Sequence, residues 1–177
     1  MGRNILKYGV IAGLVVGIAL FCISLTYDGL PPPDYGMALG YLTMLVALSA
    51  VFVGIKRHRD VDRGGVIRFW PAFGMGLGIS LIAGVFYVAA WELAMPVIDV
   101  DSAQVFATQM IEQQKAKGID AAALAKLTAE MAEFRTMYAN PLYRVPMTFA
   151  EIFPVGILVS LVSAAVLRNP RVLPARS

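Results

Sequence analysis

The segment FGMGLGISLIAGVFYVAAW, residues 73–91, decides the fold, because it is long, apolar and free of charged side chains. An α-helix needs about 20 such residues to cross the roughly 30 Å of hydrocarbon in a bilayer. A transmembrane β-barrel would instead need many alternating segments of about ten residues. Similar continuous runs occur three more times, and only the last contains a charge, Glu151. We therefore predict an all-α fold, a four-helix transmembrane bundle with helices at about 8–26, 36–55, 73–91 and 147–167.

The composition also indicates a membrane protein. Of the 177 residues, 58% are hydrophobic and 15% are charged, whereas soluble domains are about half apolar and a quarter charged. The single cysteine excludes a disulfide-stabilised scaffold, and the apolar content excludes a disordered chain. The length suits one domain, so we predict a single membrane domain over residues 1–177 with the lipid bilayer as its first partner.

Basic residues predict the orientation of the helices. The loop after the second helix and the two tails contain ten of the fifteen Lys and Arg residues, whereas the first connection, 28–35, contains none. Short basic loops stay in the cytoplasm, so we expect both termini and this loop to be cytoplasmic and the insert 96–143 to lie outside. The loop is too short for a nucleic-acid site and lacks an aromatic platform; contact with anionic lipid is the expected role of its basic residues, which are Lys56, Arg57, Arg59, Arg63 and Arg68.

The insert 96–143 contains the signals of a helical hairpin. Asp101 can cap a helix over about 102–117 that Gly118 ends, and Asp120 can cap a second helix. The second helix has an apolar seam at steps of three and four and stops at Asn140 and Pro141. The seam either folds back within the hairpin and onto the membrane surface or pairs with a partner subunit, and its shortness favours the first. Its residues are Leu124, Leu127, Met131, Phe134 and Tyr138.

Small residues recur at a spacing of four within the apolar runs. Such faces let helix backbones approach closely, and van der Waals contact then replaces the hydrophobic effect that lipid cannot supply. Packing within the bundle and packing in a homo-oligomer use the same faces, and we favour the bundle. The predicted packing positions are Gly9, Gly13, Gly17, Gly36, Gly40, Gly74, Gly76, Gly78, Gly84, Gly156 and Ser160.

Glu151 is the most conspicuous residue in the apolar runs, because charge inside a membrane span is costly and often functional. Pro154 follows it and frees the carbonyl of Ala150, which predicts a local opening in the helix. Glu92 and Arg144 flank the same end of the bundle and complete a candidate vestibule. One interpretation is a cation or proton site; the other, which we favour, is an interfacial salt bridge that fixes helix ends.

Signatures of catalysis and cofactor binding are weak. His58 is the only histidine and stands between two arginines, where we expect it to be solvated or to face lipid. No cysteine or histidine pair has metal-ligand spacing, and the glycines of residues 74–78 lack the strand and lysine of a phosphate-binding loop. We therefore predict no cofactor and no metal, and an enzyme is the least supported class.

Four strings resemble a known family: LKYGVIAGL (6–14), GMALGYLTMLVALSAVFVGIKRHRD (36–60), GGVIRF (64–69) and YANPLYRVPMTFAEIFPVG (138–156). Together they resemble the bacterial inner-membrane family catalogued as domain of unknown function 4199, over about residues 6–167. The resemblance implies four transmembrane helices, a basic cytoplasmic loop and a periplasmic insert. It brings no activity, so none of its recurring positions is assigned a chemical role; here these are Gly54, Lys56, Arg57, Arg59, Glu151, Pro154 and Gly156.

Three functional hypotheses follow. The first, which we prefer, is a structural or interaction protein of the inner membrane, homo-oligomeric or bound to a membrane partner through the insert. The second is a small transporter or ion pathway that uses Glu151 and Glu92, although four helices are few for an alternating-access carrier. The third is a membrane enzyme at the outer leaflet, which would require a wet pocket joining Glu92, Arg144 and Glu151.

Overall fold

The computed structural model describes residues 1–27, 30–98 and 101–174. These residues form helices and no strand, so the predicted all-α class is confirmed. The connection residue Asp28, the insert residue Asp99 and the tail residue Arg176 lie outside the described residues. The helices are α1 (Gly2–Thr26), α2 (Pro33–Arg57), α3 (Phe69–Ala94), α4 (Ser102–Ala116), α5 (Ala121–Tyr138) and α6 (Pro141–Leu167), and a π-helical turn, η1 (His58–Asp62), continues α2.

Four of these helices, α1, α2, α3 and α6, are long and apolar enough to cross a membrane. Each contains one predicted apolar run and extends beyond it, because the residues next to the run continue the helical backbone hydrogen bonding. Helix α6 begins at Pro141 instead of near Met147. The Asn140 side chain accepts a hydrogen bond from the Leu142 N–H at 3.0 Å, and proline in a first turn loses no helical hydrogen bond. Residues 141–143 therefore belong to α6 and not to the insert.

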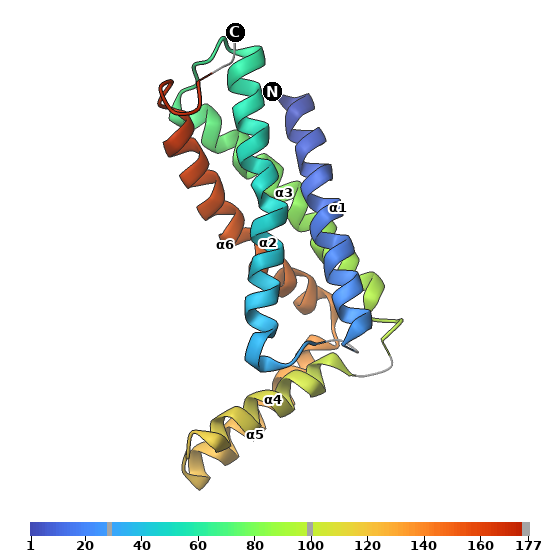
Figure 1. The fold of residues 1–177 in the computed structure, drawn as a ribbon. Coiled ribbons are helices and arrows are strands. Elements are labelled where there is room, and N and C mark those ends of the chain that lie inside the picture. Colours follow the sequence, from blue (N-terminus) through green and yellow to red (C-terminus); the bar gives the residue numbers. More distant parts are fainter. Residues whose placement is uncertain (28–29, 99–100, 175–177) are drawn as a thin grey trace.

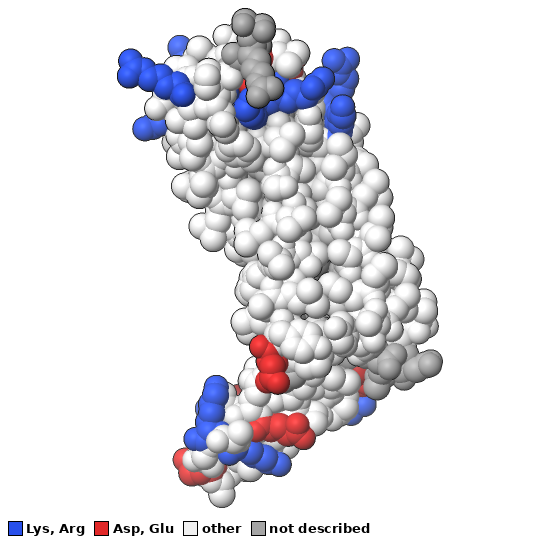
Figure 2. All heavy atoms as spheres, in the orientation of Figure 1, with Lys and Arg blue, Asp and Glu red and all other residues white. Residues whose placement is uncertain are grey.

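The four long helices pack as an antiparallel bundle in which α3 contacts both α1 and α6 (Figure 1). Helix α1 begins, and α2 and α6 end, at one end of the bundle, which we call the basic end because Lys and Arg gather there (Figure 2). Helices α4 and α5 form a hairpin that leans away from the other end, which we call the hairpin end. Between the two ends the visible surface carries no charged residue.

The hairpin is closed by the predicted caps. Asp101 accepts a hydrogen bond from the Gln104 N–H at 3.0 Å, and Asp120 accepts one from the Ala123 N–H at 2.8 Å. Gly118 has a φ of +76°, a left-handed conformation that glycine adopts without strain and that ends α4. Arg135 of α5 also donates to Asp101 at 2.7 Å. Burial raises the pKa of Asp101, but the Gln104 N–H and the Arg135 guanidinium outweigh it, so the pKa lies below its usual range.

Small residues bring α3 close to both of its neighbours. A Cβ added at Gly13 of α1 would lie 2.6 Å from Phe86 Cγ of α3. On the other face of α3, a Cβ at Gly76 would lie 2.7 Å from Ser160 Cβ, and one at Gly156 of α6 would lie 2.6 Å from Ser80 Cβ. Other glycines with side chains close against them are Gly9, Gly17, Gly54, Gly78 and Gly84.

Three predicted packing glycines have other surroundings. The atoms nearest to a Cβ added at Gly36 belong to the neighbouring Pro31, just before the start of α2. An added Cβ at Gly40 or Gly74 would meet no atom within 4 Å, so these two positions make no close helix contact in this chain. Regular spacing identifies a small-residue face, but it does not say whether another helix covers that face.

The difference between Gly13 and Gly40 predicts opposite effects of the same substitution. Gly13→Ala should lower the free energy of unfolding by about 1–3 kcal/mol, because the new methyl group meets the Cβ end of Phe86, which cannot rotate away. Gly40→Ala should be neutral or stabilising by up to about 1 kcal/mol, since alanine is the better helix former. Chemical unfolding in mild detergent measures both. Equal losses at the two positions would contradict the close approach of α1 to α3.

Candidate functional site

Glu92 and Arg144 form an ion pair at the hairpin end. Arg144 Nε and Nη2 donate to the two carboxylate oxygens of Glu92 at 2.7 and 2.6 Å. Glu92 lies in the last turns of α3 and Arg144 in the first turn of α6, so the antiparallel packing of these helices brings the two together. Arg144 Nη1 also donates to the Tyr138 carbonyl at 3.2 Å. A bidentate ion pair of this kind is a strong form of salt bridge. Together with the bond to the Tyr138 carbonyl, it links α3, α5 and α6.

Glu151 is separate from this pair. Its Oε2 accepts a hydrogen bond from the Tyr87 hydroxyl at 3.0 Å, and it lies seven residues after Arg144, about two helical turns along α6. Within the described part of the chain Glu151 has no Lys, Arg or His partner. The three residues of the expected vestibule are thus divided into an ion pair and a carboxylate that faces a tyrosine.

Pro154 lies one turn beyond Glu151 and is exposed. Helix α6 continues through it, as it does through Pro146. Because Pro154 has no N–H, the Ala150 carbonyl lacks its helical donor.

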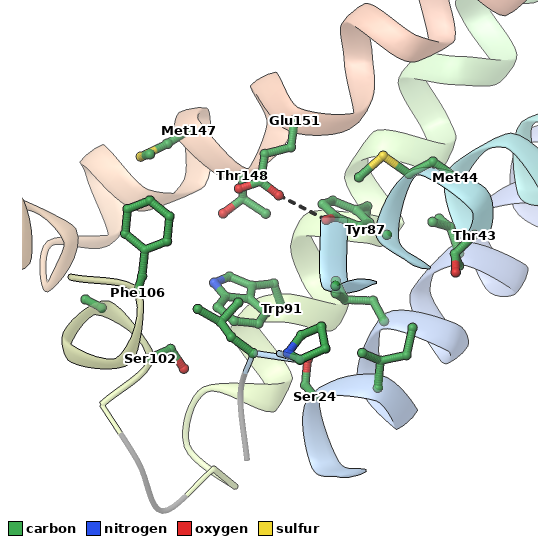
Figure 3. A pocket seen from close by; sticks show the side chains of 18 of the residues that line it. Ser24, Thr43, Met44, Tyr87, Trp91, Ser102, Phe106, Met147, Thr148 and Glu151 are labelled. Carbon is green, nitrogen blue, oxygen red and sulfur yellow. Dashed lines mark hydrogen bonds between the residues drawn. The ribbon is translucent and has the colours of Figure 1, made fainter. Parts of the chain in front are cut away.

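A cavity of about 210 Å³ lies beside Glu151, where the hairpin meets the bundle (Figure 3). Its wall is mainly apolar, and the Glu151 carboxylate and the Tyr87 hydroxyl lie on one side of it. Gly36 and Gly40 form part of the α2 wall, and the missing side chain of Gly40 helps to keep the space open. The apolar lining comes from all six helices and includes Val16, Leu20, Met44, Phe106, Phe134 and Met147.

Three buried hydroxyl groups line the same cavity. Ser24, Ser102 and Thr148 are at most 2% exposed, and their hydroxyl oxygens have no hydrogen-bond partner among the described residues. A buried polar group without a partner is costly, so such groups mark a place where a ligand or water completes the bonding. None of the three was a candidate site residue in the sequence, since a single serine or threonine carries no signal of a binding site.

Tyr138 of α5 also lines the cavity. Its hydroxyl accepts a hydrogen bond from Trp91 Nε1 at 2.9 Å. Burial raises the pKa of the Tyr138 phenol, and the hydrogen bond from the Trp91 N–H only partly opposes that rise. The phenol is therefore neutral at physiological pH and fixes the hairpin to α3 and α6.

The basic end has its own buried cluster, centred on Arg59. We expected Arg59 to contact lipid, but its side chain is 0% exposed. It donates to Asp60 Oδ1 at 2.6 Å and to the carbonyls of Val172, at 3.0 Å, and of Leu173. The π-helical turn rotates Arg59 inwards, where it satisfies carbonyl groups just after the end of α6. This interaction joins residues more than 100 positions apart in the sequence, so local sequence gave no sign of it.

His58 is also buried, which corrects the expectation of a solvated or lipid-facing ring. Its Nδ1 lies 2.7 Å from Asp62 Oδ2, and the Asn4 amide donates to the same oxygen at 2.8 Å. The π turn is thereby fixed to the first turn of α1. Lys56 bonds to Asp60, and the remaining basic residues of this loop, which are exposed, are Arg57, Arg63 and Arg68.

Residues 7–169 match the family model described as a protein of unknown function, DUF4199. The chain belongs to this family. The match confirms the resemblance seen in the sequence and includes the cavity, the hairpin and Arg59 of the DUF4199 chain. No curated protein and no solved structure matches it. Among the residues that the structure describes, no group of three or more His, Cys, Asp or Glu side chains is placed to hold a metal ion.

Arg59 should be far more important for stability than its neighbour Arg57. Arg59→Met should lower the free energy of unfolding by about 3 kcal/mol or more, because it leaves buried carbonyl groups and Asp60 without their donor. Arg57→Met, at an exposed site in the same segment, should change it by less than about 0.5 kcal/mol. Unfolding in mild detergent compares the two. Similar values would mean that the Arg59 cluster does not form.

A double-mutant cycle tests the ion pair of Glu92 and Arg144. Arg144→Gln should lower the free energy of unfolding by about 2 kcal/mol, because it leaves a half-buried carboxylate unpaired. Adding Glu92→Gln should restore part of that loss, since no charge then lacks a partner. Strictly additive losses would show that the two residues do not interact.

Proposed function

We propose that this DUF4199 protein is a non-catalytic interaction protein of the bacterial inner membrane that self-associates through its α4–α5 hairpin. The observation that carries the proposal is an open groove of about 870 Å³ along the hairpin. Its walls come from α4 and α5, with Met95 and Ile98 at the end nearest the bundle, and include Ala107, Ile111, Thr128, Met131, Ala132 and Arg135.

The hairpin buries too little of itself to fill this groove. Tyr138 is the only buried residue of α5 among those described, and the seam residues Leu127, Met131 and Phe134 are only half-buried. Most of the stability of a helix in a protein comes from the packing of its apolar face and not from the helix alone, and α4 and α5 have only 15 and 18 residues. A partner that covers the groove would supply the missing contact.

The charge of the hairpin favours a second copy over a membrane surface. Residues 101–138 contain four basic side chains, Lys115, Lys117, Lys126 and Arg135. They also contain five acidic ones, Asp101, Glu112, Asp120, Glu130 and Glu133. Helices that lie on anionic membranes are instead rich in Lys and Arg. A surface with both acidic and basic residues can bind a second copy of itself in a symmetric dimer. In such a dimer an acidic residue of each copy can contact a basic residue of the other.

The charges along the bundle support the proposed orientation. Lys and Arg gather at the basic end, where α1 begins and α6 ends, and the positive-inside rule favours a cytosolic position for that end. The hairpin then lies in the periplasm, where it can meet the hairpin of another copy.

The contacts of the two acidic residues, Glu92 and Glu151, favour a non-catalytic role over an ion pathway. Glu92 is held by both nitrogens of Arg144 and is not free to exchange an ion. Beyond Glu151, the next polar pair along α6 is Ser160 with Ser80, about 13 Å further at 1.5 Å per residue. A relay of ions or protons needs closer steps than that.

The mass of the purified full chain in mild detergent tests self-association. We expect a dimer whose dissociation constant rises about tenfold or more with Ala132→Arg, because the new side chain fills the groove wall with an unpaired charge. Ala129→Arg is the matched control: it introduces the same charge three residues earlier, at an exposed position outside the groove, and should leave the dimer intact.

Two results would contradict the proposal. The first is a strictly monomeric wild-type chain at all accessible concentrations. The second is equal weakening by the two arginine variants, which would mean that the hairpin's total charge, and not the groove, controls association.

A further inference from the structure

The cavity beside Glu151 has the features of a ligand site, and this inference does not depend on self-association. One water molecule needs about 10–15 Å³ of such space, so a cavity of about 210 Å³ is large enough for a molecule of roughly ten or more non-hydrogen atoms. Glu151 lines the cavity and yet keeps an exposed side chain, so the cavity is not sealed. A molecule can therefore reach the carboxylate.

The polar groups of the cavity point to the chemistry of the ligand's head. Glu151 offers carboxylate oxygens, of which Oε2 has one bond from Tyr87. Thr148 is on the same helix one turn earlier, and its hydroxyl has no partner among the described residues. Figure 3 shows both side chains next to Tyr87. A head group that donates several hydrogen bonds matches this set of acceptors.

The charge of Glu151 further limits which head groups can bind. An anionic head would be repelled by the carboxylate, and a neutral head would leave its charge unpaired within a membrane span. A cation compensates the charge, and the aromatic rings of Tyr87 and Trp91 in the same wall suit a cation as well. Arg144, the nearest basic residue along α6, is already bound to Glu92 and does not supply this charge.

The residues that line the rest of the cavity indicate the chemistry of the ligand beyond its head group. Apolar side chains of α1, α2, α4 and α5 line most of the cavity, including Leu20, Met44, Phe106 and Phe134. We propose that the cavity binds an amphiphile with one primary ammonium head, which pairs with Glu151 and donates to Thr148, and an aliphatic body that lies against these residues.

The two tryptophans of the chain provide a direct assay. Trp91 lines the cavity, whereas Trp70 is 74% exposed on α3 near the basic end. Trp70→Phe leaves Trp91 as the only tryptophan, and Trp91→Phe leaves Trp70 as a reference for probe that merely dissolves in the bilayer. Bromine quenches tryptophan fluorescence on contact, so the probes are bromodecylamine, bromodecanol and bromodecanoate, each added to the full chain in phosphatidylcholine nanodiscs.

We expect bromodecylamine to quench Trp91 at a concentration about tenfold or more below that needed for Trp70. The alcohol and the carboxylate should quench the two tryptophans at similar concentrations. The three probes are compared at Trp91 in the Trp70→Phe chain, whose cavity is unaltered, so this comparison does not depend on the folding of a cavity variant. In the Trp70→Phe background, Glu151→Gln should shift the amine curve about tenfold to higher concentration. Ser24→Leu, which fills the cavity from α1, should weaken binding of the amine as well.

Two outcomes would overturn the proposal. If the alcohol quenches Trp91 as well as the amine does, and Glu151→Gln has no effect, then the cavity binds neutral amphiphiles and Glu151 does not recognise the head. If no probe quenches Trp91 in preference to Trp70, then the cavity is not an amphiphile site.

Discussion

The close approach of α3 to α1 on one side and to α6 on the other is the contact on which the rest of the structure depends. Lipid chains are as apolar as the side chains they would replace, so helices in a bilayer associate through contact distance and not through the hydrophobic effect. Gly13 against Phe86, and the reciprocal pairs of Gly76 with Ser160 and Gly156 with Ser80, provide that contact. The Ser80 hydroxyl of α3 adds a hydrogen bond to the Gly156 carbonyl of α6 at 3.3 Å.

Two arginines hold α6 at its two ends and so determine where the bundle is rigid. Arg59 binds carbonyl groups just beyond the last turn of α6, and Arg144, in its first turn, binds Glu92 of α3. Between Arg144 and the tightly packed middle of α6, the helices separate enough to leave a cavity. There Gly40 of α2 faces open space, and the carboxylate of Glu151 has a tyrosine as its partner in place of a cation. The fold thus positions a charged acceptor inside an apolar space near one end of a rigid bundle.

Much of the fold could be predicted from the sequence, because length, hydropathy and capping are local properties. The four apolar runs identified the long helices, and Asp101, Gly118 and Asp120 identified the hairpin. The site was harder to predict. Glu151 stood out as an acid within an apolar run, but its partner Tyr87 lies 64 residues away. Arg59 looked like any other residue of a basic loop, because its burial results from a π-helical turn and from carbonyl groups near the far end of the chain. The same limit applies to Gly40, whose spacing matched a packing face that no helix covers.

The assignment of an inner and an outer face is the central claim, since the periplasmic hairpin and the side from which the cavity is reached both follow from it. Cys22 is the only cysteine, so Cys22→Ser provides a background for single cysteines at Ala129 in the hairpin and at Arg63 in the basic loop. A membrane-impermeant maleimide added to intact spheroplasts measures their accessibility. We expect the cysteine at residue 129 to react at once and the cysteine at residue 63 to react only after the membrane is permeabilised. The reverse pattern, or equal reaction of both in intact cells, would contradict a bundle that crosses the membrane with its basic end in the cytosol.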